Sequence, residues 1–257
     1  MKRDLFDLSE RSALITGGGR GLGKAMAIGL AERGANIAIV DIDHELAQQA
    51  AKEIESIGVK SLAIRADVTK KEDALTAVDT VVKAWGGLDV LVNNAGIAIQ
   101  GAAEDVPLDE FKRVYEIDVF GLMNFSQAAF RPMAAQKRGC ILNISSIAGM
   151  IVPTPQKQAS YNSAKAAVIL LTKSLAVEWA PFGIRVNAIA PGYMMTPPLE
   201  KMKAEDPERW KAWMNGVPMR RVGEPAELQG AAVYLVSDAS SYVTGQTIVI
   251  DGGMTSV

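Results

Sequence analysis

The chain has 257 residues, of which 49% are hydrophobic, and its formal net charge is -2. This length suits one large α/β domain, and the near-even charge without a basic stripe argues against a nucleic-acid partner and favours small molecules. No apolar run approaches the ~20 residues that span a bilayer, and the first four residues start no apolar signal segment, so we expect a cytoplasmic protein without membrane association.

The lone cysteine and the lone histidine narrow the possible chemistry. Cys140 opens an apolar segment, so we expect it in the core, and it cannot form an internal disulfide. His44 lies in the polar first turn of a predicted helix and should be exposed. A single histidine excludes a histidine-rich zinc site and leaves one candidate for a Ser-His-Asp triad, so we expect no metal.

The first predicted elements are a strand, a glycine turn and a helix. An apolar strand over residues 12–16 leads into the glycines of residues 17–23, and a helix follows over residues 24–33. Such glycines let the backbone turn sharply, and they let a pyrophosphate approach the N–H groups at a helix N-terminus. The next strand, residues 36–40, ends at Asp41, at the distance where an acidic residue binds adenosine ribose hydroxyls. The combination predicts dinucleotide binding.

The rest of the chain alternates between helices and strands. Predicted helices span residues 45–57, 71–85, 108–136, 159–180 and 224–237, and predicted strands span residues 60–65, 89–92, 140–144, 184–190 and 247–250. Apolar strands that alternate with helices indicate a parallel sheet covered on both faces. We therefore expect a single doubly wound, Rossmann-type α/β domain over residues 1–257, with a seven-stranded, mostly parallel sheet. Residues 191–222, rich in methionine and tryptophan, would cover the substrate.

Six predicted strands are followed by glycine, proline or polar residues. Ligands of doubly wound sheets bind beyond the carboxyl ends of the strands, so these residues outline one predicted site. They are Gly17, Asp41, Asp67, Asn94, Ser146 and Pro191.

Tyr161 and Lys165 lie four residues apart in a predicted helix and therefore project from one face, one turn apart. A nearby ammonium favours the phenolate form of a tyrosine, which would let Tyr161 exchange a proton with an alcohol. Ser145 and Ser146 follow a predicted strand, and either hydroxyl would be placed to bind a substrate oxygen.

Taken together, these motifs resemble the short-chain dehydrogenase/reductase family over essentially the whole chain. The matching motifs are Thr16-Gly17-x-x-x-Gly21-x-Gly23, Asn93-Asn94-Ala95-Gly96, Ser146, Tyr161-x-x-x-Lys165, Pro191-Gly192 with Thr196, and Asp251-Gly252-Gly253. The resemblance implies an oxidoreductase that needs no metal and transfers a hydride between NAD and a secondary alcohol or ketone. Tyr161 would be the acid/base, Ser146 would orient the substrate oxygen, with Ser145 as the second candidate, and Lys165 would support the phenolate and hold the nicotinamide ribose.

The resemblance also implies the residues that contact the cofactor. Asp41 favours NAD, because it would repel the 2′-phosphate of NADP, whereas Arg20 argues for NADP unless it serves the pyrophosphate. The implied cofactor residues are Gly17, Arg20, Gly21, Leu22, Gly23, Asp41, Asp67, Val68, Asn94, Ala95, Gly96, Tyr161, Lys165, Pro191, Gly192, Met194 and Thr196.

One position departs from the family pattern. The family usually has asparagine where this chain has Asp118, and that asparagine is thought to anchor a water that links the lysine to solvent. A carboxylate accepts from a water but donates only if protonated, so Asp118 is a candidate catalytic residue in an altered relay. Alternatively, Asp118 is a helix residue that faces a backbone donor.

Three further segments look most like the polyol dehydrogenases of the family: residues 152–162, 179–181 and 217–219. They imply oxidation of a polyol to its ketose, and the amides of Gln156 and Gln158 would bind several hydroxyls. The methionines and tryptophans of residues 191–219 favour an apolar substrate instead. The alternatives are an NADPH-dependent 3-oxoacyl carrier-protein reductase and a cofactor-binding protein without turnover. The resemblance also implies a homotetramer, packed through the helix from Leu108 and the helix that bears Tyr161.

Overall fold

Seven parallel strands form one sheet in the order β3-β2-β1-β4-β5-β6-β7 in the computed structural model, which describes residues 4–257 apart from the side chains of Pro198 and Arg209. All six strand pairings are parallel, which confirms the predicted doubly wound architecture. The strands are β1 Ser12–Thr16, β2 Asn36–Asp41, β3 Ser61–Arg65, β4 Val90–Asn93, β5 Gly139–Ile144, β6 Ile184–Pro191 and β7 Thr247–Ile250.

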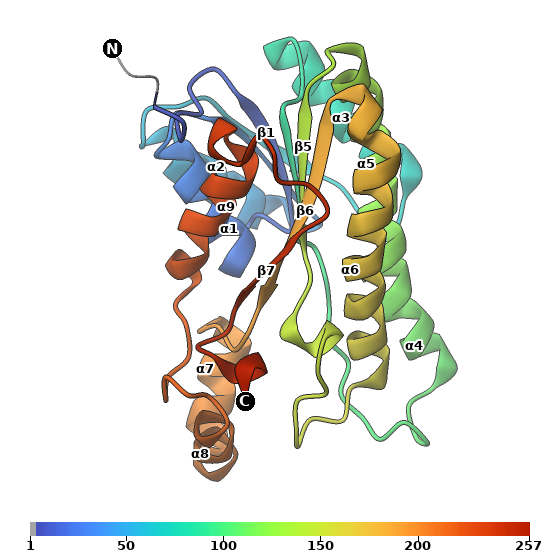
Figure 1. The fold of residues 1–257 in the computed structure, drawn as a ribbon, viewed down its shortest axis with the longest axis vertical. Helices are drawn as coiled ribbons and strands as arrows, with labels where there is room; N and C mark the ends of the chain where they lie inside the picture. Colours follow the sequence, from blue (N-terminus) through green and yellow to red (C-terminus); the bar gives the residue numbers. More distant parts are fainter. Residues whose placement is uncertain (1–3) are drawn as a thin grey trace.

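The helices cover both faces of this sheet (Figure 1). Helices α1, α2 and α9 lie on one face, and α3, α5 and α6 lie on the other. None of the helices in the described part of the chain is both long and apolar enough to cross a membrane. The helices are α1 Gly21–Ala31, α2 His44–Glu55, α3 Lys71–Trp85, α4 Leu108–Tyr115, α5 Leu122–Ala135, α6 Ala159–Trp179, α7 Pro197–Glu205, α8 Pro207–Asn215 and α9 Gln229–Val236.

Each face of the sheet has its own core. Successive strand residues point to opposite faces, so Ile15 and Ile39 pack in the cluster that contains Met26 of α1, whereas their neighbours Leu14 and Val40 pack in the cluster of α3, α5 and α6. The two covered faces explain why the strands are continuously apolar. Cys140 is buried and His44 is exposed, as expected.

One predicted helix boundary was wrong. Helix α1 begins at Gly21, within the glycine motif, although glycine is a poor helix former. The long helical stretch predicted over residues 108–136 is present, and it consists of α4, a π-helical turn at Glu116–Gly121, and α5. Apolar spacing does not distinguish a π turn from an α turn, and such turns are frequent at functional sites.

The segment 191–222 extends beyond the carboxyl ends of the strands. It contains α7 and α8, which lie together at the lower end of the molecule below β6 and β7 (Figure 1). The last predicted helix begins as a 3-10 turn, Pro225–Leu228, in which Glu224 and Glu227 form a capping box.

Candidate functional site

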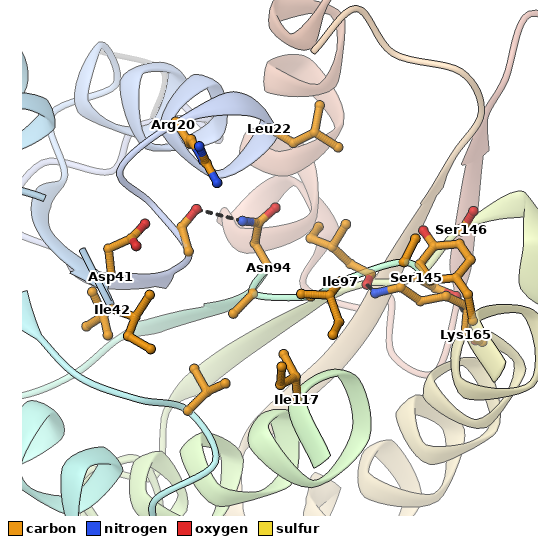
Figure 2. A pocket seen from close by; sticks show the side chains of 18 of the residues that line it. Arg20, Leu22, Asp41, Ile42, Asn94, Ile97, Ile117, Ser145, Ser146 and Lys165 are labelled. Atoms are coloured by element: carbon orange, nitrogen blue, oxygen red, sulfur yellow. Dashed lines mark hydrogen bonds between the residues drawn. The ribbon is translucent and has the colours of Figure 1, made fainter. Parts of the chain in front are cut away.

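A cavity of about 550 Å³ opens at the carboxyl ends of the strands. Figure 2 shows Asp41 and Ile42 at one end of it, Ser145, Ser146 and Lys165 at the other, and Asn94 between them. The residues named from the sequence that line it are Gly17, Arg20, Leu22, Asp41, Asp67, Val68, Asn94, Ala95, Gly96, Ser145, Ser146, Tyr161, Lys165, Pro191 and Gly192.

The glycine turn is held in place by Asn94. Its amide, labelled in Figure 2, donates to the carbonyl oxygens of Thr16 at 3.1 Å and Gly17 at 2.9 Å, and the figure marks one of these bonds. Gly17 has a φ of 60°, which favours glycine, and a Cβ at Gly23 would lie 2.3 Å from the Gly17 oxygen. The turn thus presents backbone at the N-terminus of α1, an arrangement that fits a cofactor pyrophosphate.

The carboxylate of Asp41 is fixed at the opposite rim of the turn. One oxygen accepts from the Gly19 N–H at 3.0 Å, and the other accepts from the Asp43 N–H at 3.1 Å. Each carboxylate oxygen has a second lone pair, so Asp41 retains the capacity to accept from two ribose hydroxyls. This geometry fits the adenosine end of a dinucleotide.

Lys165 is buried on α6 and held from two sides. Its Nζ donates to the Ile144 carbonyl oxygen at 3.1 Å and lies 3.0 Å from Asp118 Oδ2. It also lies 5.5 Å from the centre of the Tyr161 ring. Burial disfavours the ammonium, but the opposing charge of Asp118, with a smaller contribution from Tyr161, outweighs it and raises the pKa of Lys165. The lysine is therefore a fixed cation beside the tyrosine.

Asp118 lies behind the cavity wall, in the π turn between α4 and α5. It is 1% exposed, and its second oxygen accepts from the Ile97 N–H at 2.8 Å. The backbone donor expected as the alternative role for Asp118 is thus present. In addition, the carboxylate pairs directly with Lys165, a contact that the sequence did not indicate.

The two serines after β5 have different surroundings. The Ser145 hydroxyl donates to the Lys165 carbonyl oxygen at 2.8 Å, so its proton is used to fix α6. The Ser146 hydroxyl accepts from the Ala148 N–H at 3.1 Å, which leaves its proton for another acceptor. Throughout residues 4–257, no protein group hydrogen-bonds to the Tyr161 hydroxyl. Ser146 and Tyr161 thus offer free hydroxyl groups to a ligand.

Some predicted site residues lie outside the cavity lining. Gly21 and Thr196 face one another, with 3.9 Å between a Cβ built on Gly21 and Thr196 Cγ2, while Gly23 packs behind the turn. Met194 is buried in the core and pairs with Gly223 in a β-bridge. None of these residues, nor Asp118, lines the cavity.

The two glutamines expected to bind substrate hydroxyls are used within the protein. Gln156 contacts the Tyr193 hydroxyl, and Gln158 donates to Asn162 Oδ1 at 3.0 Å. Neither lines the cavity, so the structure gives no support to that argument for a polyol.

Several lining residues were not named as ligand contacts from the sequence. Most of them adjoin strand ends and could have been found by extending each motif by a residue or two, but those on α4 and the π turn carry no local signal. The additional residues are Val40, Ile42, Ala66, Ile97, Ala98, Arg113, Ile117 and Ile144.

Comparison with known proteins agrees with this geometry. Residues 17–255 match the family model described as enoyl-(acyl carrier protein) reductase. Sorbose reductase of Candida albicans is 40% identical, with 98% of this chain and 89% of the relative covered. Galactitol 2-dehydrogenase (L-tagatose-forming) of Cereibacter sphaeroides is 40% identical over 98% of both chains. 3beta-hydroxysteroid dehydrogenase 1 of Eggerthella lenta is also 40% identical, over 97% of this chain and 95% of the relative.

Solved structures show the same fold with either cofactor. NAD+-bound xylitol dehydrogenase superposes with a TM-score of 0.91 at 36% identity, over 96% of this chain and 99% of that one. Gluconate 5-dehydrogenase from Burkholderia cenocepacia, in complex with NADP and tartrate, superposes with a TM-score of 0.92 at 37% identity, over 99% of this chain and 98% of that one. The chain therefore belongs to the short-chain dehydrogenase/reductase family and is an NAD(P)-dependent oxidoreductase acting on CH–OH groups.

Proposed function

We propose that the protein is an NAD-dependent polyol dehydrogenase that oxidises a sugar alcohol to its ketose. The observation that carries the chemistry is the free Tyr161 hydroxyl at the end of the cavity, with the fixed cation of Lys165 beside it. The substrate class rests on the relatives named galactitol 2-dehydrogenase, sorbose reductase and xylitol dehydrogenase.

Tyr161, Ser146 and Lys165 divide the work of this reaction. Bound NAD would supply the hydride acceptor. The Tyr161 phenolate removes the proton from the substrate hydroxyl, while the Ser146 hydroxyl donates to the same oxygen and orients it. Lys165 stabilises the phenolate through its charge and holds the nicotinamide ribose. A secondary alcohol thus loses a proton to the protein and a hydride to the cofactor, which yields a ketone.

Asp118 is proposed as the residue that keeps Lys165 charged and in place. A buried ammonium is costly unless it is paired, and the carboxylate 3.0 Å away supplies the opposite charge. An asparagine at this position would supply a dipole but no charge.

NAD is proposed over NADP because of Asp41. Both of its oxygens are oriented by backbone N–H groups at the adenosine end of the cavity, where a 2′-phosphate would meet a like charge. Arg20, which lines the same cavity, is assigned to the pyrophosphate.

A second candidate substrate class is a hydrophobic alcohol or ketone. The steroid dehydrogenase relative is as similar as the sugar-alcohol enzymes, and residues 191–219 are rich in methionine and tryptophan. The carrier-protein reductase alternative is favoured by the name of the matching family model and by Arg20.

A steady-state screen with NAD and NADP tests these proposals. It compares pentitols, hexitols, their ketoses, hydroxysteroids, cycloalkanols and a 3-oxoacyl thioester. We expect the highest kcat/KM for a polyol with NAD. A highest value for a steroid or an acyl thioester, without turnover of any polyol, would overturn the substrate proposal. Binding of NAD without turnover of any compound would favour the non-catalytic alternative.

We also propose a homotetramer that buries the outer faces of the α4–α5 region and α6. Phe120, in the π turn before α5, is 58% exposed, and Leu170 and Val177 of α6 are 66% and 77% exposed, so an interface over these elements would remove large apolar side chains from water. Light scattering at micromolar concentration should give about four times the 27.4 kDa chain mass, and a monomeric mass would contradict the proposal.

A further inference from the structure

Three side chains connect the segments that border the substrate end of the cavity. Gln156 lies in the loop before α6, five residues from Tyr161. Tyr193 follows Gly192, a lining residue at the end of β6, and Trp213 belongs to α8. None of the three lines the cavity itself, so any effect they have on the reaction must pass through the position of these segments.

The amide of Gln156 is the centre of this contact. It is 7% exposed and lies 2.5 Å from the Tyr193 hydroxyl. The surrounding donors and acceptors favour the amide orientation in which the oxygen faces Tyr193. In that orientation the oxygen accepts from the Tyr193 hydroxyl and from the Trp213 indole N–H at 3.3 Å, and the nitrogen donates to the carbonyl oxygens of Pro153 and Thr154. A buried amide with partners on both sides is a specific connection, because losing one partner leaves a buried polar group unpaired.

The two aromatic rings reinforce this connection. Tyr193 and Trp213 stack with their centres 4.6 Å apart and their planes 9° from parallel. Trp213 is 5% exposed, and among the described residues of α7 and α8 it is the only buried side chain. It is therefore the main anchor of these two helices.

Backbone pairing holds the two ends of the segment, where the Met219 N–H also donates to the Gly252 carbonyl oxygen at 3.2 Å. The Gly223 N–H donates to the Tyr193 carbonyl oxygen at 2.9 Å, and the Met195 N–H donates to the Gly223 carbonyl oxygen at 2.7 Å. Between these points α7 and α8 extend away from the sheet (Figure 1). On α7 and α8 themselves, Trp213 supplies the buried contact with the rest of the protein, while Val217, just after α8, is buried as well.

We propose that Gln156, Tyr193 and Trp213 form a clamp that positions the α7–α8 segment against the loop preceding Tyr161, and that this clamp sets the affinity for the substrate. The inference rests on the proposed function, because it assigns the covering segment to the same site. The three are positioning residues. Substrate binding should therefore depend on these three residues, whereas NAD binding and proton transfer should not.

Tyr193→Phe is the sharpest variant, because it keeps the stacked ring and removes only the hydroxyl. We expect KM for the best substrate to rise about 10-fold, with kcat changed by no more than roughly twofold and the Kd for NAD unchanged. Trp213→Leu, which removes the stack as well, should raise KM further. Trp210→Phe on the same helix is the matched control, since Trp210 contacts Lys203 and not the clamp. An unchanged KM in both clamp variants, or an equal loss of NAD affinity, would overturn the proposal.

Limited trypsin digestion gives a second readout that needs no substrate. The segment carries exposed lysines at positions 201, 203 and 211. Tyr193→Phe and Trp213→Leu should accelerate cleavage there, while the melting temperature stays within a few degrees of wild type and Trp210→Phe digests like wild type. Unchanged digestion of the clamp variants would refute the clamp even if the enzyme proves to act on another alcohol. Faster digestion with no polyol turnover would instead support the clamp and reject the proposed substrate.

Discussion

The cofactor end and the substrate end of the cavity are built in different ways. At the cofactor end, Gly17 and Asn94 follow directly after strands and Asp41 is the last residue of one, and their positions are fixed by hydrogen bonds that involve the backbone. At the proposed substrate end, residues 150–158 and 192–222 lie outside the sheet and are joined through side chains such as Gln156 and Trp213. The cofactor end is therefore determined by the sheet itself, whereas the substrate end can change with few substitutions, which fits relatives that share a fold but carry the names of different substrates.

The largest effect is expected for Tyr161→Phe, which removes the proposed proton-transfer group between the two ends. Turnover should fall ~10²–10⁴-fold, the usual contribution of a general acid/base, while the Kd for NAD stays the same because the ring remains. Stopped-flow or steady-state rates, with NAD titrations as the control, check this. Retention of most of the wild-type kcat would exclude Tyr161 from the role.

A substitution in the glycine turn should damage the cofactor end alone. In Gly23→Ala the new Cβ would lie 2.3 Å from the Gly17 oxygen and 2.5 Å from Asn94 Nδ2. Relieving that clash must distort the turn, so we expect NAD affinity to fall ~10–100-fold, measured by calorimetry. Gly230→Ala in α9 is the control, because nothing lies within 4 Å of its Cβ. Equal NAD affinity in both variants would contradict the assignment of the turn.

Exchange of the acidic residue at the rim should alter the choice of cofactor. Asp41→Ser removes a charge and two acceptors from the adenosine end, so the ratio of kcat/KM for NAD to that for NADP should fall about 10-fold or more. The change should appear in KM for the cofactor and not in KM for the alcohol. A wild-type enzyme that already prefers NADP would contradict the proposal that Asp41 selects NAD.

Asp118→Asn tests the charge pair beneath the catalytic centre. Asp118 raises the pKa of Lys165 against the effect of burial, so its neutral replacement should lower that pKa. The ammonium is present below its pKa and lost above it, so the alkaline limb of the kcat/KM profile should move to lower pH. Activity near pH 7 should change little, because the amide oxygen of the variant can still accept from the Ile97 N–H. An alkaline limb that does not move would show that Lys165 does not need the carboxylate.

The smallest effect concerns an exposed charge pair near the base of the α7–α8 segment. Arg221 donates two hydrogen bonds to Glu227, at 2.6 and 2.7 Å, and together with the Glu224 N–H it lowers the Glu227 pKa from 4.5 to about 2. A carboxyl group whose pKa is lower in the folded than in the unfolded chain stabilises the fold at pH values above its unfolded pKa. This stabilisation is lost as the pH falls through the folded pKa. Glu227→Gln should therefore lower the melting temperature slightly at pH 7. The difference from wild type should shrink below about pH 4.5 and vanish near pH 2. A difference that persists at pH 2 would show that shape, and not charge, is responsible.

The sequence by itself determined the elements whose signals are local. A strand followed by glycines, an acidic residue at the end of the next strand, and Tyr161 four residues before Lys165 each occupy a short stretch, so the parallel sheet and the glycine turn were predictable. The tertiary structure alone decided that Asp118 pairs with Lys165, because a π turn between α4 and α5 brings the carboxylate against α6. It also decided that Gln156 binds Tyr193 and Trp213 and not a ligand, because those partners lie 37 or more residues away in the chain. Hydrogen-bond partners that are far apart in the chain are brought together by tertiary packing. Such packing leaves no periodic or local pattern in the sequence.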